Sequence, residues 1–154
     1  TRVAAMDWRY LLWLLDGFHG RIGRKTFWIA MLAVGAANMA ACYAASQIQG
    51  DQLNAIVDLV FTYPEFAIAT KRANDRNLPF WLLGVFFAAS VMLDLFSVVG
   101  WAGSDASPST LAYALAVPFT AFGIALLVEL GFRKGTVGPN PHGPDPLAGA
   151  GRAS

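Results

Sequence analysis

Three carboxylic acids lie inside otherwise apolar stretches of the sequence, and they are the residues best suited to chemistry. Asp58 and Glu65 interrupt the stretch 53–70, and Asp94 comes late in the stretch 79–100. An ionisable side chain at the centre of a membrane-spanning helix costs about 2.5–3.5 kcal/mol, so residues of this kind commonly handle protons or ions. The three acids are therefore the candidate residues for a proton or cation site within a membrane.

A polar stripe connects two of these acids to the basic residues that follow them. Its members recur every three or four residues, so they share one face of a helix, and that face must meet protein or water rather than lipid. The stripe consists of Asp58, Thr62, Glu65, Ala69, Arg72 and Arg76. Counted from the basic loops at about 1.5 Å per residue, Asn38, Asp58 and Asp94 reach a similar depth. We expect an intramembrane polar cluster of Asn38, Asp58, Glu65 and Asp94.

This cluster has two interpretations. It is either a proton or cation site, or a hydrogen-bonded clasp that fixes the register of the helices and holds at least one carboxyl in its protonated form. No basic residue is expected at the same depth, and no acid continues inward past Glu65. Both observations favour the clasp.

Four apolar stretches supply the elements that position these residues. The chain is 56% hydrophobic and 14% charged, whereas about a quarter of the residues in soluble domains are charged. About 20 helical residues cross the hydrocarbon core of a bilayer. We predict an all-α polytopic membrane domain over 1–134 and a Gly/Pro-rich cytoplasmic tail over 135–154. The predicted transmembrane helices, at about 27–47, 53–70, 79–100 and 110–132, form a four-helix bundle of two hairpins.

The N-terminal stretch 3–18 has apolar residues at helical spacing, interrupted by Asp7, Arg9 and Asp16. It is too short to span a bilayer. We predict an amphipathic helix that lies in the headgroup region or packs on the other helices or on a partner. Because its apolar run ends at Asp16 without a small-residue cleavage site, we expect no signal peptide.

The distribution of basic residues predicts the topology. All eleven Lys and Arg residues precede the first predicted span, lie between the second and third, or follow the fourth. The two other connections, near Asp51 and Asp105, have none. The positive-inside rule therefore places both termini in the cytoplasm.

The residue sets of common enzyme and metal sites are absent from the sequence. His19 and His142 are far apart, with no Cys or acid at metal-ligand spacing. There is no phosphate-binding loop and no nucleophile elbow, and the lone Cys42 allows no disulfide framework. We expect a non-enzymatic protein without cofactor, metal or nucleic-acid partner.

Three motifs suggest a family. They are GRIGRKTFW at 20–28, KRANDR at 71–76 followed by Trp81, and GTVGPNPHGPDP at 135–146. Together they resemble the DUF805 family of small, mostly bacterial inner-membrane proteins of unknown function. Asn74 and His142 depart from the pattern, which commonly has a His and an aromatic residue there. The resemblance implies an inner-membrane location and a cytoplasmic-face motif made of Arg21, Arg24, Trp28, Arg72, Asp75, Arg76, Trp81, Asn140, Gly143 and Asp145.

We expect the tail to fold back on the basic loops through turns formed by Pro and Gly. Asp75 and Asp145 would then pair with arginines of those loops, namely Arg21, Arg24, Arg72 or Arg76. Basic residues beside the spans also suit anionic lipid headgroups. The expected lipid contacts are Arg21, Arg24, Lys25, Arg72 and Arg76.

The short chain has no cofactor set and more protein- or lipid-binding surface than polar interior. These features favour an accessory or scaffold subunit of a larger membrane assembly. The alternative is a small transporter or proton- or cation-handling protein that uses the intramembrane carboxylates. The expected partners are membrane lipids and other membrane subunits, and homo-oligomerisation stays open.

Overall fold

The computed structural model describes residues 7–48, 51–101, 103–104 and 107–148. They form five helices, one hairpin of two short strands, and connecting segments that include the irregular tail after Gly131. The hairpin pairs β1 (Gly103–Ser104) with β2 (Ser107–Pro108). The helices are α1 (Trp8–Leu15), α2 (Arg24–Ser46), α3 (Asp51–Arg76), α4 (Phe80–Val98) and α5 (Thr110–Gly131). Arg2, Asp105 and Arg152, which entered the topology argument, lie outside the described residues.

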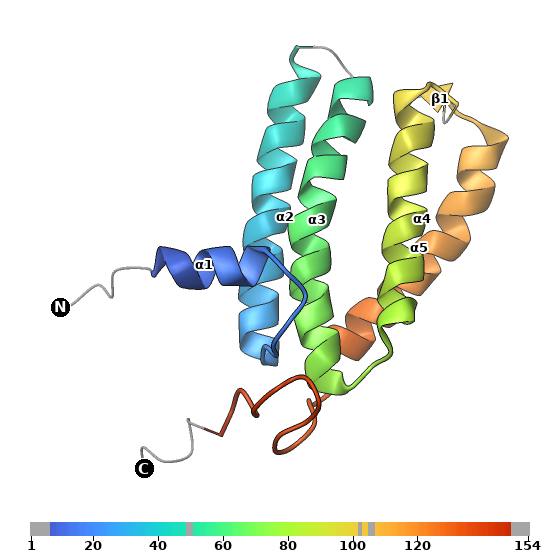
Figure 1. The fold of residues 1–154 in the computed structure, drawn as a ribbon. Helices are drawn as coiled ribbons and strands as arrows, with labels where there is room; N and C mark the ends of the chain where they lie inside the picture. Colours follow the sequence, from blue (N-terminus) through green and yellow to red (C-terminus); the bar gives the residue numbers. More distant parts are fainter. Residues whose placement is uncertain (1–6, 49–50, 102, 105–106, 149–154) are drawn as a thin grey trace.

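The first helix, α1, covers part of the predicted stretch 3–18, and residues 1–6 lie outside the described residues. Its start is capped by Asp7, whose carboxylate accepts the N–H of Arg9 at 3.1 Å. It ends before Gly17, where a φ of +69° favours glycine. Figure 1 shows α1 lying crosswise to α2 and α3. Leu14 is buried, whereas Trp8 and other large apolar side chains of α1 are exposed.

Three helices are long and apolar enough to cross a membrane, namely α2, α4 and α5. They correspond to three of the four predicted spans. The fourth predicted span, 53–70, is a continuous helix that extends to Arg76. It does not qualify by composition, because Asp58, Glu65 and the basic residues at its end make it too polar. A set of four transmembrane helices is therefore not confirmed by length and composition.

The polar helix α3 lies in the middle of the fold. It packs against α2 on one side and α4 on the other, while α5 slants behind α4 and reaches the end of α3 (Figure 1). All residues from 67 to 75 are buried. Protein therefore surrounds the charged end of α3, which explains how a sequence this polar forms the central helix.

The tightly packed core lies at one end of the helices, where α3 ends and the tail begins. We call this the basic end. The buried apolar residues there come from the start of α2, the end of α3, the start of α4 and the end of α5. They include Phe27, Ala30, Ile68, Ala69, Ala73, Leu83, Phe87, Leu126 and Leu130. Of the described residues nearer the opposite end, Ala45 and Ala55 are the buried apolar ones. Packing thus loosens away from the basic end.

Candidate functional site

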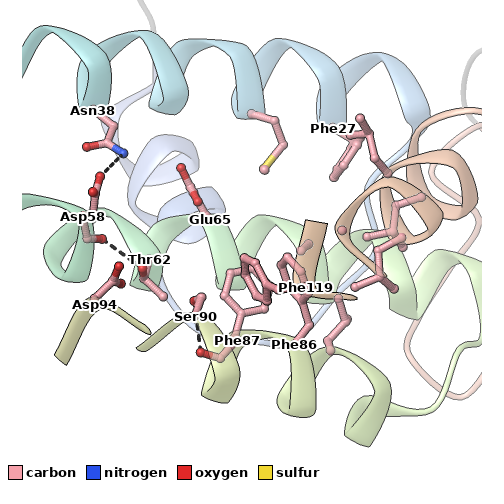
Figure 2. Close-up of a pocket in the computed structure, with 17 residues that line it drawn as sticks. Phe27, Asn38, Asp58, Thr62, Glu65, Phe86, Phe87, Ser90, Asp94 and Phe119 are labelled. Atoms are coloured by element: carbon pink, nitrogen blue, oxygen red, sulfur yellow. Dashed lines mark hydrogen bonds between the residues drawn. The ribbon is translucent and has the colours of Figure 1, made fainter. Parts of the chain in front are cut away.

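A cavity of about 400 Å³ lies between the helices, above the packed core. α2, α3, α4 and α5 all contribute to its lining. Figure 2 shows polar side chains at one end of the cavity and aromatic side chains at the other. The polar end contains Asn38, Asp58, Thr62, Glu65, Ser90 and Asp94, and the aromatic end contains Phe27, Phe86, Phe87 and Phe119. All four members of the predicted intramembrane cluster therefore line one cavity.

One part of this cluster is a hydrogen-bonded clasp between α2 and α3. Asn38 donates from Nδ2 to Oδ1 of Asp58 at 2.9 Å. The Cys42 thiol lies 3.4 Å from the same carboxylate oxygen and 3.3 Å from Oδ1 of Asn38. The hydroxyl of Thr62 donates to the backbone carbonyl of Asp58 at 2.9 Å. The clasp expected from the sequence therefore exists at Asp58.

The other two acids are not part of this clasp. Glu65 and Asp94 both line the cavity, from α3 and α4, and the described residues donate no hydrogen bond to either carboxyl. No group of three His, Cys, Asp or Glu side chains in the described part of the chain is arranged to hold a metal ion. Glu65 and Asp94 are thus available to a ligand inside the cavity.

An apolar layer closes the cavity toward the basic end. It is formed by Phe27, Leu83, Leu126 and Leu130, which are all at least nine-tenths buried. Directly beyond this layer, Arg72 donates from Nε to the carbonyl of Leu130 at 2.7 Å. The same leucine therefore belongs to the floor of the cavity and to a polar network beneath it.

That polar network is centred on Asp75, near the end of α3. Its carboxylate pairs with Arg21 at 2.9 Å and with Arg72 on its other oxygen. The side chains of both arginines are 1% exposed and that of Asp75 is 4% exposed. We call these three residues and the backbone groups they bind the Asp75 network. Two guanidinium groups share one buried carboxylate, so the remaining donors need backbone acceptors.

The tail supplies acceptors for Arg21. Its guanidinium donates to the carbonyls of Thr136 at 2.7 Å, Gly138 at 2.8 Å and Gly143 at 3.1 Å. In return, the N–H of Thr136 donates to the carbonyl of Asp75 at 2.8 Å. The Asn140 side chain donates to the carbonyl of Asn74 at 2.9 Å. The tail thus folds back on the basic loops, as the sequence predicts.

The three sequence motifs meet in this network. The family described as "Protein of unknown function (DUF805)" matches residues 15–144, a range that contains nearly all of the three motifs. The chain belongs to the DUF805 family. No curated protein and no solved structure matches it. The description of the family names no activity.

The predicted ion pair of Asp145 is wrong. Its carboxylate accepts the backbone N–H groups of Leu147 at 2.9 Å and Gly138 at 3.0 Å instead. These two bonds, together with the nearby positive charge of Arg21, hold the pKa of Asp145 below its usual range. In this DUF805 chain Asp145 therefore closes a turn of the tail, and Asp75 alone pairs with the arginines of the network.

The other predicted motif residues occupy different places. Trp28 donates from Nε1 to the carbonyl of Gly131 at 3.1 Å and so joins α2 to α5. Arg24 donates to the carbonyl of Phe132 at 3.1 Å. Arg76 pairs with Glu129 at 2.5 Å, outside the Asp75 network. Trp81 is 65% exposed at the start of α4 and takes no part in the network.

The sequence prediction missed a buried lysine next to the network. Lys71 is fully buried, and its ammonium donates to the carbonyls of Gly17 at 2.5 Å and Asp16 at 3.0 Å, just after α1. It also lies 5.3 Å from the ring of Trp13. The available signal was its place one residue before Arg72 in the DUF805 motif, but its partners come from a turn that only the fold brings close.

Proposed function

We propose that this DUF805 chain is a multi-pass protein of the bacterial inner membrane, with α3 as its fourth transmembrane helix and both termini in the cytoplasm. α3 has 26 residues, about 39 Å at 1.5 Å per residue, which exceeds a hydrocarbon core of about 30 Å. Its polar residues face the cavity, and its charged end is buried. Such an arrangement avoids the cost of exposing them to lipid.

We infer that the cavity binds a lipophilic cation and that the protein acts as a small cation-handling membrane protein. The observation that carries this proposal is the exposure of Glu65 and Asp94 to a cavity of about 400 Å³ without a hydrogen bond from the described residues. A purely structural clasp accounts for Asp58, which is bound by Asn38. It does not account for the other two acids.

The two ends of the cavity suit the two parts of such a ligand. A carboxylate at the polar end attracts the positive charge. The rings of Phe86, Phe87 and Phe119 offer apolar surface and aromatic faces, which also attract cations. Cavities of about 300–1,000 Å³ with apolar walls and a few polar groups are typical of small-molecule sites.

The proposal is tested by titrating the purified protein in mild detergent with tetraphenylphosphonium and measuring the heat of binding at pH 8. We expect saturable binding that weakens about tenfold in Glu65→Gln and in Asp94→Asn, equivalent to roughly 1.4 kcal/mol for each. Each substitution removes one negative charge while keeping the shape of the side chain.

Thr62→Val is the matched control, because Thr62 lines the same cavity but donates to its own helix. It should change the affinity less than twofold. Absence of binding, or an equal loss of affinity in Thr62→Val, would contradict the cation proposal. If the protein binds the cation, measuring flux of the same ion into vesicles that contain the protein would distinguish transport from binding alone.

An accessory or scaffold role is the second candidate. It is supported by the large apolar side chains that α1 and α2 expose, including Trp8 at 63%, Met39 at 75% and Tyr43 at 72%. A partner subunit could cover these surfaces, although lipid could also do so. Purification in the same detergent discriminates the candidates, because a stoichiometric larger complex without tetraphenylphosphonium binding would support the accessory role.

A further inference from the structure

A second cavity lies at the basic end, beside the Asp75 network. It has a volume of about 580 Å³ and lies between the start of α2, the end of α5 and the tail. Arg24, Lys25, Trp28, Phe132 and Leu147 are among its lining residues. A smaller cavity of about 270 Å³ shares Arg24 and Leu147 with it and adds Lys134. We call the two together the basic basin.

The charges of the basin are not balanced. Among the described residues, no carboxylate pairs with Arg24, Lys25 or Lys134. The other arginines around it are already neutralised by acids. Arg21 and Arg72 pair with Asp75, and Arg76 and Arg133 pair with Glu129. The larger cavity therefore has two unpaired cations and no acid in its lining. The smaller cavity adds Lys134, and the two carboxyls in its lining are held by other groups: Asp75 by the arginines of its network, and Asp145 by backbone N–H groups.

The backbone adds further donors on the same side. α2 begins after Gly23, which has no side chain to cap the first turn. No acceptor among the described residues binds the N–H groups of Arg24, Lys25 or Thr26, and such groups favour an anion. By contrast, the carbonyls at the end of α5 are occupied. Arg72 binds that of Leu130, Trp28 binds that of Gly131, and Arg24 binds that of Phe132.

We propose that the basic basin binds the phosphate of an anionic phospholipid. The phosphate would lie against Arg24, Lys25 and the first turn of α2. The rim is apolar, with Phe132 62% exposed and Leu147 67% exposed, and the next turn of α2 exposes Ile29. A soluble phosphate would leave this rim in water, whereas the acyl chains of a lipid cover it.

The structure changes the set of basic residues that are available to bind a lipid headgroup. Of the five residues expected from the sequence, Arg21 and Arg72 are fully engaged in the Asp75 network, and Arg76 is held by Glu129. Arg24 and Lys25 remain, and Lys134 joins them. This inference rests on the proposed membrane placement but not on the cation cavity, which shares no lining residue with the basin.

The test is native mass spectrometry of the full chain in mild detergent, after delipidation. Palmitoyl-oleoyl phosphatidylglycerol and palmitoyl-oleoyl phosphatidylcholine are added separately. We expect one tightly held phosphatidylglycerol and about tenfold weaker retention of phosphatidylcholine, corresponding to roughly 1.4 kcal/mol. Lys25→Gln should lower phosphatidylglycerol retention about tenfold. Its ammonium has no hydrogen-bond or ion-pair partner among the described residues, so the substitution removes neither kind of bond from the fold.

Arg133→Gln is the matched control, because it removes the same charge from the same region at a residue that does not line the basin. Equal losses in Lys25→Gln and Arg133→Gln, or equal retention of the two lipids, would overturn the proposal.

Competition with inorganic phosphate distinguishes a lipid phosphate from free phosphate as the bound anion. Full displacement by phosphate, together with no effect of Leu147→Ser, would assign the basin to a soluble phosphate and overturn the lipid assignment. Tetraphenylphosphonium binding should be unchanged in Lys25→Gln. A failure of the lipid proposal can therefore be distinguished from a failure of the cation proposal.

Discussion

A single carboxylate, that of Asp75, holds two buried guanidinium groups, and its backbone carbonyl holds the tail. The motif residues of the sequence predict that Asp75 pairs with an arginine of the basic loops. They do not predict which one, because Arg21 lies 54 positions away in the chain and reaches Asp75 only once α3 is placed. The same limit explains the wrong prediction for Asp145. A carboxylate in a Gly/Pro turn has backbone N–H groups within reach that the sequence does not reveal.

Asp75→Asn should strongly destabilise the protein. The change removes the negative charge from between two side chains that are 1% exposed. Loss of one partner of a buried ion pair typically costs about 3–5 kcal/mol, and the amide oxygen can still accept one hydrogen bond, so we expect about 3 kcal/mol. The measurement is chemical unfolding in detergent, with protease cleavage of the tail as a second readout.

Asp145→Asn serves as the comparison for this prediction. Its amide oxygen can still accept the N–H group of Gly138 or of Leu147, and no arginine among the described residues forms an ion pair with Asp145. Because one of the two accepting oxygens is lost on an exposed turn, we expect a much smaller loss of stability than in Asp75→Asn. Equal destabilisation by the two substitutions would contradict the claim that the charge of Asp75 stabilises the fold by pairing with Arg21 and Arg72.

At the scale of elements, apolar length predicts the helices well and their packing poorly. The observed helices begin and end within a few residues of the predicted spans, apart from the extension of α3 to Arg76. The polar stripe also predicts which face of α3 turns inward. What the stripe cannot predict is the cavity, because it arises where the helices are less tightly packed above Phe27, Leu83 and Leu130. Packing of this kind depends on side chains from four helices at once.

The contact between α2 and α5 depends on one glycine. A Cβ on Gly131 would lie 2.6 Å from the ring of Trp28, closer than side chains tolerate. Gly131→Ala should therefore destabilise the protein by about 1–3 kcal/mol through overpacking. Unfolding in detergent measures the effect.

Gly35→Ala is the control, in the same helix as Trp28. A Cβ at Gly35 has no neighbour within 4 Å, so this substitution should be neutral or stabilising by up to about 1 kcal/mol. A larger loss in Gly35→Ala than in Gly131→Ala would contradict this account.

At the scale of the whole molecule, the position of α3 decides the topology. If α3 crosses the membrane, the loop before α2 and the tail are on the same side. If it does not, the three remaining candidate spans put these two segments on opposite sides. Basic residues in the sequence predict the first arrangement, whereas the composition of α3 alone would suggest the second. The burial of α3 between α2 and α4, and the hydrogen bond from Arg21 to Thr136 of the tail, support the first arrangement.

Single-cysteine labelling tests this topology. In a Cys42→Ala background, His19→Cys, Trp101→Cys and Val137→Cys each place a thiol at an exposed position. With a membrane-impermeant maleimide applied to spheroplasts, we expect labelling at position 101 alone, and labelling at 19 and 137 only after lysis. Labelling of 19 and 137 on opposite sides would rule out α3 as a transmembrane helix.

The dependence of Arg21 on the tail also has a consequence for biosynthesis. Arg21 leaves the ribosome early, yet the carbonyls of Thr136, Gly138 and Gly143 that satisfy its guanidinium are among the last of the described residues to be translated. Until then, two positive charges at the end of α3 share one carboxylate and lack acceptors. A chain that stops before residue 136 would therefore leave several donors of the Arg21 guanidinium without their acceptors. Once residues 136–143 have been translated, the network can close, so folding of this end has to follow translation of the tail segment.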